Sequence, residues 1–170
     1  LIPALDKIGA EFEKGTLFLP QLIMSAGVAQ AAFEVIRKHM VMSDNAPVSK
    51  GKIVIATVKG DVHDIGKNIV KVLLENYGYD VIDLGKDVDY QAVVDAIRDN
   101  DVKLCGLSAL MTTTLVSMKE TIALIRENNL DCKVMVGGAV LTPEYAKEID
   151  ADFYAKDAKE SVDIAKRVLG

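Results

Sequence analysis

The feature of this 170-residue sequence that most constrains its fold is a regular alternation of two patterns after residue 50. Short apolar runs rich in β-branched residues alternate with longer segments of helical periodicity. The apolar runs cover residues 53–58, 80–84, 103–108, 133–136 and 152–155, and the helical segments cover residues 64–77, 89–99, 115–127, 143–149 and 158–168. Runs that are apolar throughout are typical of strands buried on both faces, as in a parallel sheet. The alternation therefore predicts an α/β domain with a parallel sheet of five strands.

Five such β-α units fit one doubly wound domain, in which helices cover both faces of the sheet. A ligand of such a sheet lies beyond the carboxyl ends of the strands, where the strand order reverses. We predict a flavodoxin-like, Rossmann-like fold, which places the reversal between the first and third strands. The loops at residues 59–66 and 108–114 are then the candidate site.

The spacing of apolar residues predicts helices in the first 42 residues. Leu5, Ile8 and Phe12 recur at helical spacing, Gly15 interrupts them, and Pro20 suits the first turn of a second helix. That second helix carries one apolar stripe, formed by Leu22, Ala26, Ala29, Phe33, Ile36 and Met40. Two helices of this length bury too little by themselves, so we expect them to pack on another part of the protein.

Residues 43–50 are polar, contain a proline and have no period, which indicates a linker. We therefore predict a helical region at residues 1–42, a linker at 43–50 and the α/β domain at 51–170. Because the sequence begins without Met, we also expect further residues upstream of Leu1.

The composition excludes several classes of protein. The 20 Lys and Arg residues against 25 Asp and Glu residues give a net charge of −5, which argues against a basic nucleic-acid-binding surface. No apolar run approaches the roughly 18–20 residues of a membrane span, and the first residues lack a signal-peptide pattern. The two cysteines, Cys105 and Cys132, are too few for a disulfide framework or a Cys-rich metal site. We expect a cytoplasmic protein with no nucleic-acid or membrane partner.

The loop at residues 59–68, Lys-Gly-Asp-Val-His-Asp-Ile-Gly-Lys-Asn, is the most informative stretch. A Walker A phosphate loop is disfavoured because five residues separate Gly60 from Gly66, and Asn68 stands where a hydroxyl would hold magnesium. The three glycines of a dinucleotide fingerprint are absent. A phosphoacceptor receiver domain would end its third strand on Asp, whereas this one ends at Ser108. A His-Asp metallophosphatase would need more histidines than His63 and His39.

The remaining possibility is a single histidine presented as a ligand. Asp61, two residues before His63, can accept a proton from one imidazole nitrogen and so orient the ring. One protein ligand is too few for zinc, but it suffices for a metal whose other positions are filled by a macrocycle. The alternative is an ordinary polar loop in which Asp64 caps the following helix and His63 is merely exposed.

Three motifs in this sequence resemble those of the cobalamin-binding Rossmann-like domain. They are Asp61-x-His63-x-x-Gly66 after the first predicted strand, Ser108-x-Leu110 after the third and Gly137-Gly138 after the fourth. Residues 60–70 look like the cobalamin modules of methionine synthase and of corrinoid methyl-carrier proteins. Residues 18–21, followed by residues 24–26, resemble the last two helices of the helical cap of those proteins. The resemblance covers essentially the whole chain.

This resemblance implies that the chain binds cobalamin or a related corrinoid, as methylcobalamin, hydroxocobalamin or the reduced Co(I) form. His63 would be the lower axial ligand of cobalt and would displace the cofactor's own base, whose tail would enter beside small residues. The Ser108 hydroxyl would meet that base, Thr112 would reach the corrin, and Phe18 would cover its upper face. The residues expected at the cofactor are Asp61, His63, Asp64, Ile65, Gly66, Ser108, Leu110, Thr112, Thr114, Gly137, Gly138 and Phe18.

The family's ligand triad maps onto His63, Asp61 and Thr114, where Thr114 replaces the serine of methionine synthase. We hypothesise that this relay couples the oxidation state and ligation of cobalt to protonation.

The resemblance further implies a methyl carrier with no turnover of its own. It would accept a methyl group from a substrate-specific corrinoid methyltransferase acting on a methylamine, methanol or a methoxylated aromatic. It would pass that group to a second methyltransferase that uses tetrahydrofolate or a thiol, and a reductive activase would be a third partner. The alternatives are a cobalamin-binding fragment of methionine synthase, a mutase cobalamin domain, a cobalamin-dependent sensor domain and a flavodoxin-like domain without a corrinoid.

Overall fold

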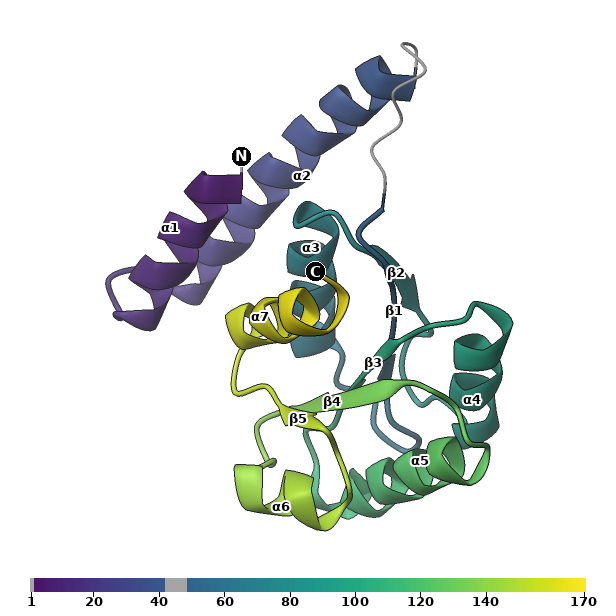
Figure 1. Ribbon diagram of the computed structural model, residues 1–170. Coiled ribbons are helices and arrows are strands. Elements are labelled where there is room, and N and C mark those ends of the chain that lie inside the picture. The colour runs from purple at the N-terminus through teal and green to yellow at the C-terminus, as the bar shows by residue number, and fades with distance from the viewer. Residues whose placement is uncertain (1, 42–48) are drawn as a thin grey trace.

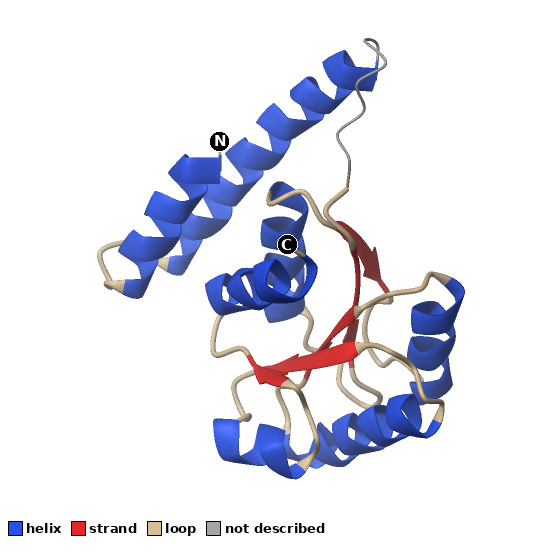
Figure 2. Cartoon of the chain, in the orientation of Figure 1, coloured by secondary structure: helices blue, strands red, loops and turns tan. Residues whose placement is uncertain are grey.

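A computed structural model describes residues 2–41 and 49–170 of the chain (Figures 1 and 2). Two helices come first, α1 (Ile2–Glu13) and α2 (Leu19–Val41). The strands are β1 (Lys52–Thr57), β2 (Asp80–Asp83), β3 (Leu104–Ser108), β4 (Lys133–Gly137) and β5 (Phe153–Tyr154). The remaining helices are α3 (Ile65–Asn76), α4 (Tyr90–Asp99), the 3-10 turn η1 (Thr112–Thr114), α5 (Leu115–Glu127), α6 (Pro143–Glu148) and α7 (Ala158–Leu169).

The strands form one parallel sheet in the order β2-β1-β3-β4-β5. This is the predicted flavodoxin-like order, with its reversal between β1 and β3, so the predicted fold class is confirmed. The register pairs Thr57 with Ser108 and Ser108 with Gly137. The last residues of three neighbouring strands therefore stand in one row at the carboxyl edge of the sheet.

Two apolar cores cover the two faces of the sheet, because side chains alternate along each strand. On one face Val54, Ala56 and Leu107 pack with residues of α4, α5 and α6. On the other face Ile53 and Ile55 pack with residues of α3 and α7. Figure 1 shows these helices on opposite sides of the sheet.

Both cysteines belong to the core on the α4–α5 face. Cys105 is completely buried in β3, and this burial raises the pKa of its thiol. Burial also raises the pKa of Cys132 to about 12. Both groups are therefore neutral thiols at physiological pH.

Helices α1 and α2 form an antiparallel hairpin beside α3 and α7 (Figure 1). Ala29 is buried in the same core as α3 and α7, and Phe12 and Leu22 line a small gap against Leu73 and Val162. Leu22 and Ala29 confirm two positions of the predicted stripe, and the side chains of the other four positions lie outside the described residues. Most of the predicted linker, residues 43–48, also lies outside them, so the domain boundaries stay a prediction. No helix in the described ranges combines the length and apolar composition that a bilayer span requires.

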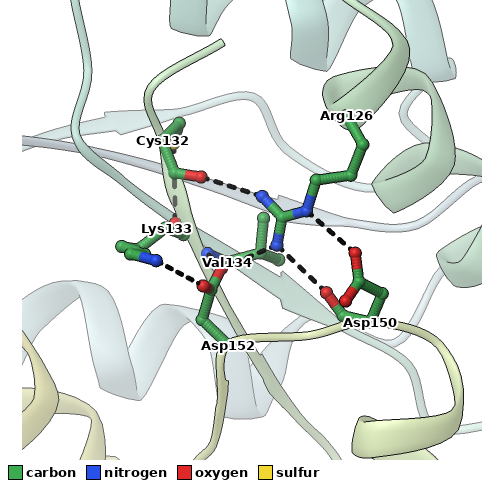
Figure 3. Close-up of polar contacts among 6 residues, drawn as sticks. All are labelled: Arg126, Cys132, Lys133, Val134, Asp150 and Asp152. Atoms are coloured by element: carbon green, nitrogen blue, oxygen red, sulfur yellow. Dashed lines mark hydrogen bonds and ion pairs between the residues drawn. The ribbon is translucent and has the colours of Figure 1, made fainter. Parts of the chain in front are cut away.

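A network of charged side chains connects α5, β4 and the segment before β5 at the amino ends of the strands (Figure 3). Arg126 at the end of α5 donates to the carboxylate of Asp152 at 2.7 Å and to that of Asp150 at 3.2 Å. Asp152 also accepts hydrogen bonds from the Lys133 ammonium and from the Val134 main-chain N–H, both at 2.8 Å. Asp152 is thus held by two cations and one main-chain donor, whereas Asp150 is largely exposed. Burial alone would raise the pKa of Asp152, but these bonds outweigh it and lower that pKa.

We expect Asp152→Asn to lower the free energy of unfolding by about 2 kcal/mol at pH 7, because it removes the negative partner of a partly buried network. Because the pKa of Asp152 is lowered in the folded state, this contribution is complete above the ordinary carboxyl pKa of about 4 and is lost as the pH falls through the folded-state pKa. Urea unfolding of both proteins from pH 7 down to pH 4 and below measures the difference.

Asp150→Asn is the matched control, since Asp150 bonds the same guanidinium from an exposed position and Asn tolerates its φ of 61°. Its cost should stay within about 0.5 kcal/mol. Equal losses in the two variants would contradict the central place of Asp152 in the network.

Candidate functional site

A cleft of about 760 Å³ opens at the carboxyl edge of the sheet, on the face covered by α3 and α7. Its floor is formed by Ile55, Gly106 and Met135, one from each of the three central strands. The start of α3 and the start of α7 form its sides, and Phe12 and Leu22 of the N-terminal hairpin also border it. The cleft therefore lies where the strand order predicts a ligand site.

His63 reaches this cleft from the loop between β1 and α3. Its Nδ1 lies 2.8 Å from Oδ1 of Asp61, and the side chain is 47% exposed. Nε2 has no hydrogen-bond partner among the residues that the structure describes. Nδ1 of the imidazole is thus held by the protein, while Nε2 is available to a ligand.

Asp61 is completely buried and accepts five hydrogen bonds. Oδ1 contacts the imidazole ring of His63 and also accepts a hydrogen bond from the main-chain N–H of His63 at 2.9 Å. Oδ2 accepts from the N–H groups of Leu110 at 2.7 Å and Met111 at 3.1 Å, and lies 3.0 Å from the Thr114 hydroxyl. The carboxylate therefore joins the loops that follow β1 and β3.

The hydrogen bonds decide the charge of Asp61. Burial by itself would raise the pKa of this carboxyl group. The donors from His63, Leu110 and Thr114 outweigh that effect and hold the pKa far below its ordinary range. An ionised Asp61 can only accept, so the proton of the neutral imidazole stays on Nδ1, and the lone pair is on Nε2.

The Thr114 hydroxyl has one proton and two acceptors within reach. It lies 3.0 Å from Asp61 Oδ2 and 2.8 Å from the main-chain oxygen of Met111. A hydrogen bond to the carboxylate is the charge-assisted one. Asp61 thus contacts both His63 and Thr114, and the relay among the three residues stays a prediction.

Small residues leave room along the edge of the sheet. Gly138 has a φ of 141°, and a Cβ atom there would lie 1.9 Å from the main-chain oxygen of Ala109. A Cβ at Gly137 would lie 3.0 Å from the oxygen of Ala155, whereas one at Gly66 would meet nothing within 4 Å. Two of these glycines thus permit close approach of main chains, and the third keeps open space beside the cleft.

The Ser108 hydroxyl lines the cleft and lies 3.0 Å from the hydroxyl of Thr57, either of which could be the donor. Thr57 is fully buried at the end of β1. The sequence motifs do not include Thr57, because its contact with Ser108 depends on the register of two strands 51 residues apart. Ser108 can keep this bond as an acceptor and still donate into the cleft.

Lys67 is a second residue that sequence reasoning missed. Its side chain is buried at the margin of the cleft, and its ammonium lies 2.5 Å from Asp83 and 2.9 Å from the Asn68 side chain. Burial would raise the pKa of Asp83, but Lys67 and the N–H of Gly85 outweigh it and lower that pKa. The ion pair fastens the first turn of α3 to the end of β2.

Most of the predicted site residues are brought together. Asp61 and Thr114 lie behind the imidazole, and the cleft is lined by His63, Asp64, Ile65, Gly66, Ser108, Leu110, Gly137 and Gly138. Asp64 precedes α3, but its side chain makes no capping hydrogen bond, contrary to the alternative of a simple helix cap. Thr112 is exposed in η1 and Phe18 is exposed before α2, and neither lines the cleft.

Exposed apolar side chains surround His63. Val62, Ile65 and Leu110 line the cleft and remain partly or largely exposed, and Met111 is exposed beside them. A half-exposed imidazole framed by apolar groups, next to a cleft whose lining includes the small residues Gly66, Ser108 and Gly137, suits a large planar metal macrocycle with a side chain that enters the protein. The residues present therefore fit a corrinoid, with His63 as the available metal ligand.

Comparison with known proteins agrees with this fit. Residues 51–163 match the B12 binding domain family, and residues 1–37 match a second family described as a B12 binding domain. The dimethylamine corrinoid protein 1 of Methanosarcina acetivorans is 42% identical over an alignment of 171 positions, which covers 99% of this chain and 80% of that protein.

Two solved structures share the fold over nearly the whole chain. A cobalamin-binding protein of Desulfitobacterium hafniense superimposes with a TM-score of 0.84 at 34% identity, over 98% of this chain and 78% of that one. The methanol:cobalamin methyltransferase complex of Methanosarcina barkeri gives a TM-score of 0.84 at 33% identity, over 97% of this chain and 63% of that one. The chain therefore belongs to the family of methyltransferase-associated corrinoid proteins, which are built on the B12-binding domain and take cobalamin or a related corrinoid as cofactor.

Proposed function

We propose that the chain is a methyl carrier that holds its corrinoid base-off, with His63 as the axial ligand of cobalt. The observation that carries this proposal is the contact between His63 Nδ1 and the buried, ionised carboxylate of Asp61 at 2.8 Å. It turns Nε2 into a preorganised metal ligand beside the cleft. Bound cobalamin supplies a cobalt centre that can accept a methyl group and give it up again.

The protein's own residues have three tasks in this proposal. Asp61 keeps the proton of His63 on Nδ1 and fixes the plane of the ring, as carboxylates do for other metal-bound histidines. The cleft, with Gly66 and Ser108 on its walls, receives the displaced nucleotide tail of the cofactor. The exposed apolar side chains of Val62, Ile65 and Leu110 offer a surface beside the imidazole that a bound macrocycle would cover.

The family suggests the partners. A protein 42% identical to this chain is named for dimethylamine, so we infer that the methyl donor is a methylamine. The donor would be handled by a substrate-specific corrinoid methyltransferase, and a second methyltransferase would transfer the group to tetrahydrofolate or a thiol. A reductive activase would reduce oxidised, inactive cobalt to the active Co(I) form.

His63→Ala tests the axial ligand. The wild-type chain, loaded with hydroxocobalamin and desalted, should retain the corrinoid and have the visible spectrum of a nitrogen-ligated cobalt. The variant should have an altered spectrum and bind at least about tenfold more weakly, because it loses a metal–ligand bond. His39→Ala is the matched control and should leave the spectrum unchanged. Identical spectra for wild type and His63→Ala would exclude histidine ligation.

Asp61→Asn tests the carboxylate behind the ligand. The amide places an NH₂ group against main-chain and hydroxyl donors, so we expect the free energy of unfolding to fall by about 2–4 kcal/mol. Corrinoid affinity should fall as well, since His63 loses the negatively charged acceptor that fixes its tautomer. Urea unfolding and equilibrium dialysis against hydroxocobalamin give the two quantities.

Thr114→Ser provides the comparison for Asp61→Asn, because it retains the hydroxyl that contacts the carboxylate. It should cost less than about 1 kcal/mol and leave corrinoid affinity nearly unchanged. Tight hydroxocobalamin binding by a folded Asp61→Asn protein would contradict the proposed role of Asp61.

A methyl-transfer assay tests the donor. The loaded and reduced protein should be methylated by dimethylamine when a dimethylamine-specific corrinoid methyltransferase is present. Methanol with its own corrinoid methyltransferase should be at least about tenfold slower, which corresponds to about 1.4 kcal/mol of discrimination between partners. Methylation by methyltetrahydrofolate and onward transfer to homocysteine, without a methylamine, would favour the methionine synthase alternative instead.

A further inference from the structure

We propose that Asp87, in the loop between β2 and α4, is a positioning residue for the cobalt ligand, an inference that rests on the proposed function of His63. Asp87 lies outside the three sequence motifs and does not line the cleft. It acts on the main chain of Gly60 and Asp61, the two residues that place the carboxylate behind the imidazole.

Two hydrogen bonds of opposite direction carry this inference. The main-chain N–H of Asp87 donates to the main-chain oxygen of Asp61 at 2.9 Å. The carboxylate of Asp87 accepts from the main-chain N–H of Gly60 at 2.7 Å. Asp87 therefore binds both the N–H of Gly60 and the main-chain oxygen of Asp61. These two bonds fix the position and the rotation of that segment.

The conformation of Asp87 makes this double contact possible. Its φ is 53°, in the left-handed region, where Asp and Asn are tolerated better than most residues. Gly60, on the other side of the contact, has a φ of 84°. The two loops meet through two residues in unusual backbone conformations, and side chains other than Asp and Asn would occupy the position of Asp87 only with strain.

Neighbouring contacts also join the first part of the loop after β1 to the loop after β2. Val58 and Val88 form an isolated parallel bridge just beyond the paired strands. Lys59 lies 2.7 Å from the Asp89 carboxylate and stacks over the Tyr90 ring. Parallel pairing thus continues past the strand ends as far as Val58, and the side chains of Asp89 and Asp87 extend the contact to Lys59 and Gly60.

Asp61 is consequently held from two sides. Its carboxylate is held by donors from the loop after β3, and its main chain is held by Asp87 from the loop after β2. If the second contact is loosened, the carboxylate keeps its donors at Leu110 and Met111 but can rotate relative to His63. We therefore expect changes at Asp87 to affect the imidazole more than the stability of the fold.

Three substitutions separate the contributions. Asp87→Gly keeps the left-handed backbone and the main-chain donor but removes the acceptor for Gly60. Asp87→Asn keeps the backbone preference and an acceptor oxygen, so it should behave as wild type. Asp101→Gly is the matched control, since Asp101 is also an exposed Asp with a φ of 49°, in the loop that leads into β3.

The first measurement uses the cobalamin-free protein, so it does not depend on metal ligation. Nitrogen-15 NMR of the His63 ring should give the single tautomer with the proton on Nδ1 in wild type, Asp87→Asn and Asp101→Gly. In Asp87→Gly we expect a mixture of tautomers, together with amide hydrogen exchange at Gly60 that is about tenfold faster because its acceptor is lost. An unchanged tautomer in Asp87→Gly would overturn the proposal, whatever happens to exchange at Gly60.

The second measurement is hydroxocobalamin affinity and the visible spectrum. Asp87→Gly should bind about three- to tenfold more weakly, with a smaller fraction of the His63-ligated spectrum, and Asp87→Asn should restore both. A loss that Asp101→Gly shares would assign the effect to general destabilisation and reject the positioning role. If His63→Ala leaves the wild-type spectrum unchanged, the proposed ligation fails, while the tautomer of the free protein still decides the role of Asp87.

Discussion

The site depends on one buried negative charge. Asp61 has no exposed surface, and a carboxylate in that position is costly unless several donors compensate it. The compensating donors come from the loops after β1 and β3, so neither loop can take up another conformation without leaving the charge uncompensated. The same charge orients His63. The stability of the loops and the orientation of the His63 imidazole therefore have a common origin.

The amino ends and the carboxyl ends of the strands have different roles. At the amino edge Arg126, Lys133 and Asp152 form a network that joins α5, β4 and the segment before β5 (Figure 3). At the carboxyl edge the polar groups are instead arranged around an open cleft. This division is usual in doubly wound domains, where ligands meet the carboxyl ends of the strands. It allows the charge network to be altered without touching the residues around His63.

Much of the fold could be predicted from the sequence, because the strands are continuous apolar runs and Asp61, His63 and Gly66 stand directly after the first of them. The strand boundaries agree with the predicted runs to within one residue at each end. The contact of Thr57 with Ser108 could not be predicted, since it depends on register between strands distant in sequence. Asp87 was missed for a similar reason: its function lies in a left-handed turn that meets another loop only in three dimensions. Phe18 and Thr112 were expected at the cofactor from resemblance alone, and their exposed positions away from the cleft leave that expectation without support from geometry.

The burial of the two thiols has a consequence for the chemistry of the family. A thiolate is a strong nucleophile, and a methyl group activated for transfer to a partner's thiol could equally alkylate a cysteine of the carrier. Cys105 is sealed inside β3, and Cys132 has its pKa raised to about 12, so neither presents a thiolate near neutral pH. If the chain carries a methyl group as proposed, neither thiol competes for that group, which is left for an acceptor that approaches from outside.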